Sequence, residues 1–358
     1  MNPCKLRCGV PLLALFASSC SSAEARAPLT DGHCLSDRQG RTICVPREPR
    51  RLSCDDVLCF ESLLTLGESA RIVEMRGTSA QWLGLDPHVL SISKFDEPSL
   101  EQMLVNDIDV AFVYSNARAL DRYQRAGIAA LVGQSVARDA SSAEKFLAGQ
   151  KENLRLYAKV LGPKAAQRAS MWEAYVDDQV RFVTSRTSTL SPHERPTVYY
   201  LRGPDALTSH GTRGCPYWYT HLAGAQMAVA GTSNQGRATI TAEQLILWNP
   251  DVVFVGRFYS VDLLLKDPRF RTLRAVEHNA VYPMPTGVFF WDGGPESVLL
   301  MLWAAKTVHP ELFPDLDLAR AIREYYSQFY GVWLDDRSLG NLLDGRSADG
   351  SRLVRKYN

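Results

Sequence analysis

The sequence predicts an α/β protein made of two similar lobes with mainly parallel sheets, joined by a single long helix. Residues 162–186 carry one apolar helical stripe with no internal Gly or Pro, at Ala165, Ala169, Trp172, Val176, Val180 and Val183. At 1.5 Å per residue, this helix would be about 35 Å long, close to one domain diameter. Residues 99–113 and 241–255, on either side of the helix, align without a gap. A repeat on both sides of a long helix favours two lobes.

The repeated stretch has the same order of residue types in both halves. A hydroxyl residue is followed by Glu-Gln, two apolar positions and Asp-Val-x-Phe-Val. Ser99 and Thr241 are suited to cap a short helix, and residues 110–113 and 252–255 have the composition of buried strands. The alternative is a coincidental match between two helix–strand units of an ordinary α/β protein.

The first 25 residues have the features of an export signal. Two basic residues precede the apolar run 10–16, which is too short to span a bilayer as a helix. The next residues resemble a bacterial lipoprotein cleavage box, with Ala in place of the common Leu, and this would put a lipid on Cys20. Cleavage near Ala23 or Ala25 without a lipid is the alternative. Both readings predict a protein in the periplasm or on the outer face of the cytoplasmic membrane.

The composition is that of a soluble globular export. Charged residues make up 22% of the chain, and Lys+Arg 40 against Asp+Glu 39 leave a net charge of +1, so nothing predicts nucleic-acid binding. We expect an N-terminal lobe at 34–161, an interlobe helix at 162–188, a C-terminal lobe at 196–345 and a tail at 346–358.

The cysteines predict at least one disulfide in an oxidising compartment. Cys34 and Cys44 flank a short turn-rich stretch that predicts a β-hairpin, and a bridge between them is sterically reasonable. Cys54 and Cys59 could form a second bridge, which the spacing leaves open. Cys215 is then left over.

Between these landmarks, the chain alternates strands and helices. Before the long helix we expect strands at 51–54, 71–74 and 128–132 and helices at 56–66 and 143–161. After it we expect strands at 197–201 and 280–282 and helices at 217–229, 296–307, 317–330 and 337–343. Such alternation predicts parallel sheets covered by helices on both faces.

Several motifs then carry a family resemblance. The N-terminal half has DRQGRTICVP from position 37, and the C-terminal half has TAEQL from 241, NPDV from 249, AVYP from 280, PTGV from 285 and HPELF from 309. Over residues 37–343 the chain resembles bacterial ABC-transporter substrate-binding proteins for iron–siderophore, haem and cobalamin-type ligands. It departs from their Ala-Gly-Gly-x-Asn stretch with AGAQM at 223–227.

The resemblance implies a class III periplasmic binding protein with two Rossmann-like lobes that clamp a ligand. We expect no enzyme activity and no cofactor of its own, since no nucleophile elbow, P-loop or zinc-protease motif occurs. The expected ligand is a metal chelate, meaning a ferric siderophore-type complex, haem or a corrinoid. A nickel or cobalt complex is the alternative ligand, and a periplasmic sensor or adaptor is the alternative role. The resemblance also implies a monomer that delivers to an ABC permease with its ATPase.

Ligands of such folds bind beyond the carboxyl ends of strands, so the loops there hold the candidate contacts. Aromatic faces suit large planar ligands, and guanidinium groups suit carboxylate or catecholate oxygens. The candidates are Trp82, Tyr114, Tyr199, Arg202, His210, Arg213, Arg257, Tyr259, Phe290 and Trp291. Trp291 is the first choice, because its Gly-rich surroundings make a core position least expected. Core packing is the alternative for each aromatic.

His210 and two glutamates receive separate roles. His210 could complete the shell of a chelated metal or donate to the chelator, and the alternative is a solvated loop residue. Glu101 and Glu243 stand at equivalent places, two residues after a capping hydroxyl. The resemblance implies that they dock onto the permease; as helix-terminal acids they would also complement a helix dipole.

Overall fold

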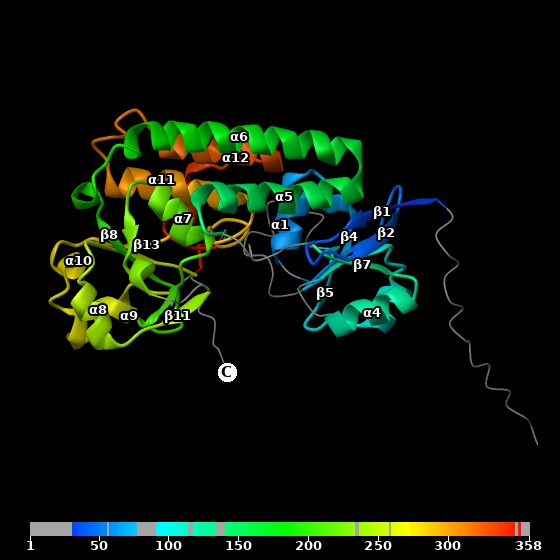
Figure 1. Cartoon of the computed structure of the whole chain (residues 1–358), viewed down its shortest axis with the longest axis horizontal. Coiled ribbons are helices and arrows are strands. Elements are labelled where there is room, and N and C mark those ends of the chain that lie inside the picture. The colour runs from blue at the N-terminus through cyan, green and yellow to red at the C-terminus, as the bar shows by residue number, and fades with distance from the viewer. Residues whose placement is uncertain are drawn as a thin grey trace, which may run out of the picture.

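Two parallel sheets dominate the structure. The computed structural model describes residues 31–55, 57–76, 91–113, 117–133, 140–232, 236–257, 259–347 and 350–351. Figure 1 shows the sheets at opposite ends of the molecule, with long helices running across both. The chain is thus an α/β protein with two Rossmann-like lobes, as predicted.

The N-terminal lobe contains a five-stranded parallel sheet of order β5-β4-β3-β6-β7. Its strands are β3 (Leu52–Cys54), β4 (Ile72–Arg76), β5 (Ser93–Phe95), β6 (Val110–Val113) and β7 (Ala129–Val132). Its helices are α1 (Val57–Thr65), α3 (Leu100–Val105), α4 (Ala117–Arg125) and α5 (Ala143–Leu161), and η1 (Ser69–Arg71) is a 3-10 turn.

The C-terminal lobe contains a four-stranded parallel sheet of order β10-β8-β12-β13. Its strands are β8 (Thr197–Leu201), β10 (Gln226–Met227), β12 (Val252–Val255) and β13 (Val281–Pro283), with a hairpin of β9 (Thr208–His210) and β11 (Arg237–Thr239) beside it. The α-helices are α7 (Cys215–Leu222), α8 (Ala242–Trp248), α9 (Asp262–Leu265), α10 (Arg274–Glu277), α11 (Val298–Val308), α12 (Leu318–Tyr330) and α13 (Asp336–Leu343). Short 3-10 turns are η3 (Pro192–Glu194), η4 (Ala228–Gly231), η5 (Pro268–Phe270) and η6 (Pro295–Ser297).

Strands β6 and β12, which end the two repeated stretches, are buried on both faces, which explains their unbroken apolar sequences. In β6, Ala111 and Val113 face a cluster with α3 and α4, whereas Phe112 stacks on Tyr157 of α5 at 4.5 Å between ring centroids. In β12, Val253 and Val255 pack with α8, while Phe254 lies 4.5 Å from the Trp303 ring of α11. Side chains alternate along each strand, so each strand contributes to two cores.

The repeated stretch folds into the same helix–strand unit in both lobes. Ser99 caps α3 by accepting from the Gln102 amide at 3.4 Å, and Thr241 caps α8 by accepting from the Gln244 amide at 3.1 Å. Both units also turn into the strand through a left-handed residue. Asp107 has φ 51° and the equivalent Asn249 has φ 41°, a conformation that Asn and Asp tolerate better than most residues.

The same acid then ties each unit to its sheet. Asp109 accepts from the Arg50 and Arg51 amides at 2.8 and 3.0 Å, next to β3. Asp251 accepts from the Thr197 amide at 2.8 Å, at the start of β8. The gapless sequence match therefore corresponds to a structural repeat and is no coincidence of helix–strand patterns.

The predicted long helix is α6 (Pro163–Thr187). Pro163 occupies its first turn, where a missing N–H is tolerated. The predicted apolar stripe faces inward: five of its six residues are buried, and the sixth, Val180, is half-buried. Helix α5 lies beside α6 and also reaches both lobes: its N-terminal end meets α7, where the Trp218 indole N–H donates to the Ala140 carbonyl oxygen at 3.1 Å. The sequence did not predict this second crossing.

The lobes meet in a hydrogen-bonded joint beneath α6. Arg168 of α6 donates to the Thr65 carbonyl oxygen of α1 at 3.0 Å and to the Phe329 carbonyl oxygen of α12 at 2.7 Å. The backbone N–H of Glu296, in η6, donates to the Glu61 carboxylate of α1 at 2.5 Å. The two lobes are thus connected by buried polar contacts as well as by helices.

Two disulfides stabilise the N-terminal lobe. Cys34 and Cys44 face each other across the antiparallel hairpin of β1 (Gly32–Ser36) and β2 (Thr42–Pro46) and are bonded, as predicted. Cys54 and Cys59 form the second bridge, which the sequence had left open. Cys215 is a buried free thiol whose pKa burial raises to about 12.

One predicted helix is wrong at both ends. The segment expected at 217–229 begins earlier, at Cys215, and ends at Leu222. Gly224 has φ 90°, and a Cβ there would lie 2.9 Å from a methyl carbon of Leu190. The chain therefore turns at this glycine and continues into β10.

Candidate ligand-binding site

A polar cluster gathers at the carboxyl edge of the C-terminal sheet, just past the ends of β8 and β12. We call Tyr200, Arg202, His210, Arg257 and Asp292 the C-terminal cluster. The Asp292 side chain is 0% exposed and accepts from Arg257 Nε at 2.6 Å and from Arg257 Nη2 at 3.1 Å. His210 Nε2 lies 2.9 Å from Asp292 Oδ2, and the Tyr200 hydroxyl donates to the same oxygen at 3.2 Å.

Burial and charge together set the protonation states of this cluster. Burial alone would raise the pKa of Asp292, but Arg257 and His210 outweigh it and hold the pKa well below its usual range. Burial lowers the pKa of His210 despite the neighbouring carboxylate. At neutral pH the cluster therefore has an ionised Asp292 and a neutral His210. A neutral imidazole that donates through Nε2 has a lone pair on Nδ1 to offer to a donor or a metal.

Glycines make this arrangement possible. A Cβ at Gly256 would lie 2.3 Å from the Tyr200 hydroxyl oxygen, and a Cβ at Gly203 would lie 1.9 Å from the Tyr259 ring. Arg257 itself has φ 57°, so the backbone turns sharply as it leaves β12. Two aromatic rings flank its guanidinium carbon, Phe290 at 5.1 Å and Phe289 at 5.9 Å.

A second polar cluster lies at the carboxyl edge of the N-terminal sheet. Asp55 follows β3, Arg76 ends β4 and Glu97 follows β5, and we call these three residues the N-terminal cluster. Arg76 donates to Asp55 Oδ1 at 2.6 Å and to Glu97 Oε1 at 3.2 Å. Burial would lower the pKa of Arg76, but the hydrogen bonds that it donates to Glu97 and Asp55 raise it. The sequence did not indicate this cluster, because the strand predicted at 71–74 ends two residues before Arg76, whereas β4 continues to Arg76.

Five of the predicted contacts are partly exposed and lie in the C-terminal lobe. They are on the segments that follow β8 and β12: Arg202, His210, Arg213, Arg257 and Tyr259, the last of them beside Gly203. Burial, followed by the charge of Arg257, lowers the pKa of Arg202. Trp82, Tyr114 and Cys20 lie outside the described residues.

Three predicted aromatic contacts are core residues instead. Tyr199 and Trp291 are 0% exposed and Phe290 is 2% exposed. The Tyr199 hydroxyl donates to the Ala206 carbonyl oxygen at 2.8 Å, so it is satisfied inside the lobe. Trp291 therefore lies in the core despite its Gly-rich surroundings, and the prediction that it would lie outside the core is wrong. Gly294, with φ 73°, lets this segment fold inward against Glu61 of α1, where a Cβ would lie 2.1 Å from the carboxylate.

The two glutamates predicted to dock onto the permease lie on the surface, and no hydrogen bond or ion pair joins them to either cluster. Glu101 and Glu243 are exposed in the first turns of α3 and α8. Backbone and Thr241 hydrogen bonds at the start of α8 lower the pKa of Glu243, so it is ionised at neutral pH.

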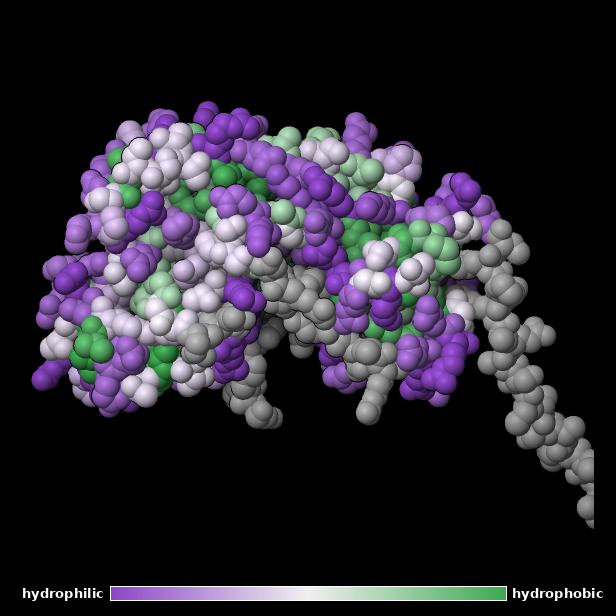
Figure 2. Space-filling model, viewed as in Figure 1, coloured by the Kyte–Doolittle hydropathy of each residue, from purple (hydrophilic) through white to green (hydrophobic). Residues whose placement is uncertain are grey.

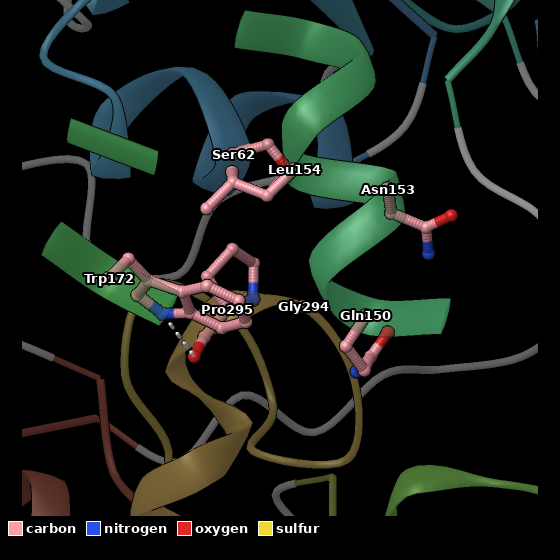
Figure 3. Close-up of a pocket in the computed structure, with 7 residues that line it drawn as sticks. All are labelled: Ser62, Gln150, Asn153, Leu154, Trp172, Gly294 and Pro295. Atoms are coloured by element: carbon pink, nitrogen blue, oxygen red, sulfur yellow. Dashed lines mark hydrogen bonds between the residues drawn. The ribbon is translucent and has the colours of Figure 1, made fainter. Parts of the chain in front are cut away.

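A direct site for a bare metal ion is missing from the described part of the chain, where no group of three or more His, Cys, Asp or Glu side chains could hold one. His210 and Asp292 supply only two such side chains. A separate enclosed cavity lies in the joint, lined by residues of α1, α5, α6 and η6 such as Trp172 and Pro295 (Figure 3). Its volume of about 10 Å³ is room for one water at most, so it is no ligand site.

Comparison with known proteins now identifies the fold family. A family model described as "Periplasmic binding protein" matches residues 58–287. The chain belongs to this family. The prediction made from the motifs is therefore confirmed. Members bind solutes outside the cytoplasm, so the chain is a binding protein rather than an enzyme and carries no cofactor of its own. None of the described helices has the length and apolar character needed to cross a membrane.

Individual relatives differ in what they bind. The molybdate-binding protein MolA of Haemophilus influenzae is 27% identical over 186 residues, which is 51% of this chain and 52% of MolA. The chain thus aligns in sequence with about half the length of this relative. The structure of MolA with molybdate superposes with a TM-score of 0.75 at 20% identity, over 85% of this chain and 99% of MolA. CeuE of Helicobacter pylori, in complex with nickel and histidine, superposes with a TM-score of 0.68 at 20% identity, over 87% and 99%.

Proposed function

We propose that this periplasmic binding protein is the substrate-binding component of an ABC importer and that its ligand is a small anionic metal complex. The shared chemistry is a metal centre surrounded by negatively charged oxygens, in a metal oxyanion or in a carboxylate- or catecholate-bearing chelate. The observation that carries the proposal is the C-terminal cluster, in which two guanidinium groups stand against one buried carboxylate at the ligand-facing edge.

The charges of this cluster favour an anion. Arg257 is held by Asp292 and Arg202 is half-buried beside it, so both guanidinium groups are already partly desolvated and positioned. A planar guanidinium donates paired hydrogen bonds to carboxylate, catecholate or oxyanion oxygens. His210 adds a neutral imidazole that could donate to the ligand or reach its metal. The MolA structure, which superposes with a higher TM-score than that of CeuE, contains molybdate, an oxyanion of this kind.

Haem and corrinoids are less favoured by the same residues. Such ligands need flat apolar walls, and Tyr199, Phe290 and Trp291 are engaged in the core. Phe289 and Tyr259 remain as half-buried aromatic surfaces near the cluster. A nickel or cobalt complex remains a candidate if the metal arrives with an anionic chelator.

Calorimetric titration of the purified chain tests the ligand class. The probes are molybdate, a ferric bis-catecholate, nickel–histidine and Ni²⁺ alone. We expect an oxygen-rich anionic probe to bind, and Arg202→Gln to weaken that binding by about 10- to 100-fold, since a hydrogen bond to a charged group contributes about 1.5–3 kcal/mol. Arg269→Gln, which changes an exposed arginine paired with Asp267, is the matched control. Binding of Ni²⁺ alone, with no response to the anions, would overturn the proposal.

We further propose that Glu101 and Glu243 dock onto the permease of the importer, which works with its ATPase. The chain would act as a monomer, held at the outer face of the cytoplasmic membrane if Cys20 carries a lipid. Each carboxylate would meet a basic group that loses water on docking, and losing one such partner costs about 2–5 kcal/mol. The sensor or adaptor role would lack this contact.

A separation of functions tests the docking role. The double variant Glu101→Ala/Glu243→Ala should bind the anionic probe with wild-type affinity, because neither residue contacts the clusters. It should fail to stimulate the permease's ATPase or to support uptake. Wild-type transport by the double variant would leave both residues as helix-terminal acids.

A further inference from the structure

The equivalent helices α3 and α8 each expose an apolar side chain at the same position. Val105 is 79% exposed and Leu247 is 78% exposed, and within the described residues no other large hydrophobic side chain is as exposed. In the gapless alignment of the two units they occupy one position, four residues after Glu101 and Glu243 respectively. The repeat therefore includes a surface feature as well as the capped helix and the buried strand.

Folding does not call for these exposed side chains. In each helix the core contact is made by another residue, Met103 in α3 and Leu245 in α8, both 0% exposed. Val105 is the last residue of α3, and a β-branched residue is not a strong helix former. Both positions leave apolar surface in water, where a polar side chain would serve the helix as well. Isolated exposed hydrophobics are common, but the same exposure at equivalent places in two lobes is a pattern.

Each apolar side chain lies on the same helix face as the glutamate. Residues four apart are neighbours on a helix surface. Each lobe therefore presents a carboxylate and an apolar side chain in one stripe. On α8 this apolar surface is larger, because Ile246, next to Leu247 in the sequence, is 44% exposed. Figure 2 shows hydrophobic side chains at the surface of the C-terminal lobe where Figure 1 labels α8.

We propose that Val105 and Leu247 are the apolar half of a two-part docking surface for the permease, next to Glu101 and Glu243. This inference rests on the proposed importer function and adds that the contact is hydrophobic as well as ionic. Exposed charges attract from a distance and are screened by salt, whereas apolar side chains that lose water on docking add an attraction that does not depend on charge. The carboxylates would thus orient the chain on the permease, and the apolar side chains would slow its dissociation.

The repeat also specifies the form of the partner. The two lobes are held together by α5, α6 and the buried joint, so their two docking stripes are presented at once. A partner that covers both stripes has two equivalent surfaces of its own, each with a basic group facing a glutamate and an apolar pocket facing Val105 or Leu247. A permease built from two similar halves has this form.

Binding of the full chain to its permease–ATPase complex in nanodiscs tests the inference. Val105→Ser and Leu247→Ser should each weaken binding about tenfold and the double variant about a hundredfold, mainly through faster dissociation. Binding should persist in high salt for the wild type and be lost there by the double serine variant. Melting temperature and affinity for the anionic probe should not change, since both side chains are exposed. Trp333→Ser, which removes a 64% exposed aromatic on another segment, is the matched control and should bind normally.

The outcomes separate this inference from the function on which it rests. If Glu101→Ala/Glu243→Ala abolishes permease binding while Val105→Ser/Leu247→Ser does not alter it, docking stands and the apolar role is wrong. If the wild-type chain does not bind the permease complex, the importer function fails and this inference with it. If the serine variants instead abolish a dimer of the chain seen by sedimentation, the apolar residues serve a second copy, and the inference is overturned.

Discussion

The two lobes share a helix–strand unit but differ in the charge at the carboxyl edges of their sheets. The C-terminal cluster has two guanidinium groups, Arg202 and Arg257, and one carboxylate, Asp292. The N-terminal cluster has one guanidinium, Arg76, and two carboxylates, Asp55 and Glu97. Among the described residues, the two edges therefore have opposite formal charge. A repeated scaffold does not produce a repeated edge, because the residues of the two clusters lie outside the repeated stretch.

The clusters also differ in burial. The Asp292 side chain is 0% exposed and has three partners, whereas Asp55 is 10% exposed and Glu97 is 85% exposed. The C-terminal cluster is therefore held in place before a ligand arrives, while one arm of the N-terminal cluster is free to respond to solvent. Preorganisation of this kind lowers the cost of ordering on binding. We expect the C-terminal lobe to supply most of the recognition of the anion.

The largest expected effect is on stability, where the difference in burial can be measured. Asp292→Asn leaves the charge of Arg257 without its buried partner, which should lower the free energy of unfolding by about 3–5 kcal/mol. Asp55→Asn should cost about half as much, because Arg76 keeps Glu97 and is 26% exposed. Urea unfolding monitored by circular dichroism measures both, with Asp178→Asn, in an exposed ion pair with Arg181, as control. Equal losses for Asp55 and Asp292 would remove the distinction between the two edges.

A smaller effect concerns the joint, where one glutamate from each lobe meets the other. Burial raises the pKa of Glu296 to about 7, although hydrogen bonds from Tyr326 and from backbone amides partly offset it. The native state therefore binds a proton more tightly than the unfolded state does. The resulting stability is fully present below the unfolded pKa of about 4.3 and is lost as the pH rises towards 7.

Melting temperatures between pH 4.5 and 8 check this prediction. Relative to Glu296→Gln, the wild type should lose stability as the pH rises through this window. The comparison with the variant is needed because His210, whose pKa is lowered by burial, changes stability in the opposite direction. Glu277→Gln, at an exposed glutamate, serves as control. Parallel pH profiles of wild type and Glu296→Gln would show that the joint does not titrate.

The smallest expected effect tests where the lobes are alike. Glu101→Ala and Glu243→Ala should each lower the free energy of unfolding by less than either Asp→Asn substitution in the clusters, since each acid lies exposed near a helix N-terminus, where water screens the helix dipole. The two losses should agree, because the capped helices are equivalent. Chemical denaturation of both variants in parallel measures this. A large difference between the two losses would show that the two glutamates contribute differently to the stability of their helices.

The sequence predicted helices, strands and turns correctly where the residues that determine them are close together in the chain. The α6 stripe, the capped units and the Cys34–Cys44 hairpin each depend on residues within about one element of each other. The end of the helix predicted at 217–229 failed because the chain turns at Gly224, where φ is 90° and Leu190 leaves no room for a Cβ, a tertiary restriction that helical periodicity does not record. The second crossing by α5 was missed for the same reason: its amphipathic pattern does not say which lobe covers it.

The site was predicted in part. Arg202, His210 and Arg257 were expected at the strand ends, and they come together there. Asp292, the residue that joins them, was missed, although it directly follows the singled-out Trp291. It lies 35 residues from Arg257 and 82 from His210 along the chain, so sequence proximity could not indicate the contact. Asp55 and Arg76, at a separation of 21, were missed likewise.

By itself, the sequence determined the α/β class, the repeated unit, the long helix and the disulfide hairpin, because periodicity, capping and turn residues act over one or two turns of chain. Only the tertiary structure decided which side chains gather at the carboxyl edge of each sheet and which enter the core. Trp291 and Asp292 are neighbours in sequence, yet one fills the core and the other holds the arginine of the candidate site. That division follows from sheet order and from the close approach of η6 to α1, both of which depend on residues far apart along the chain.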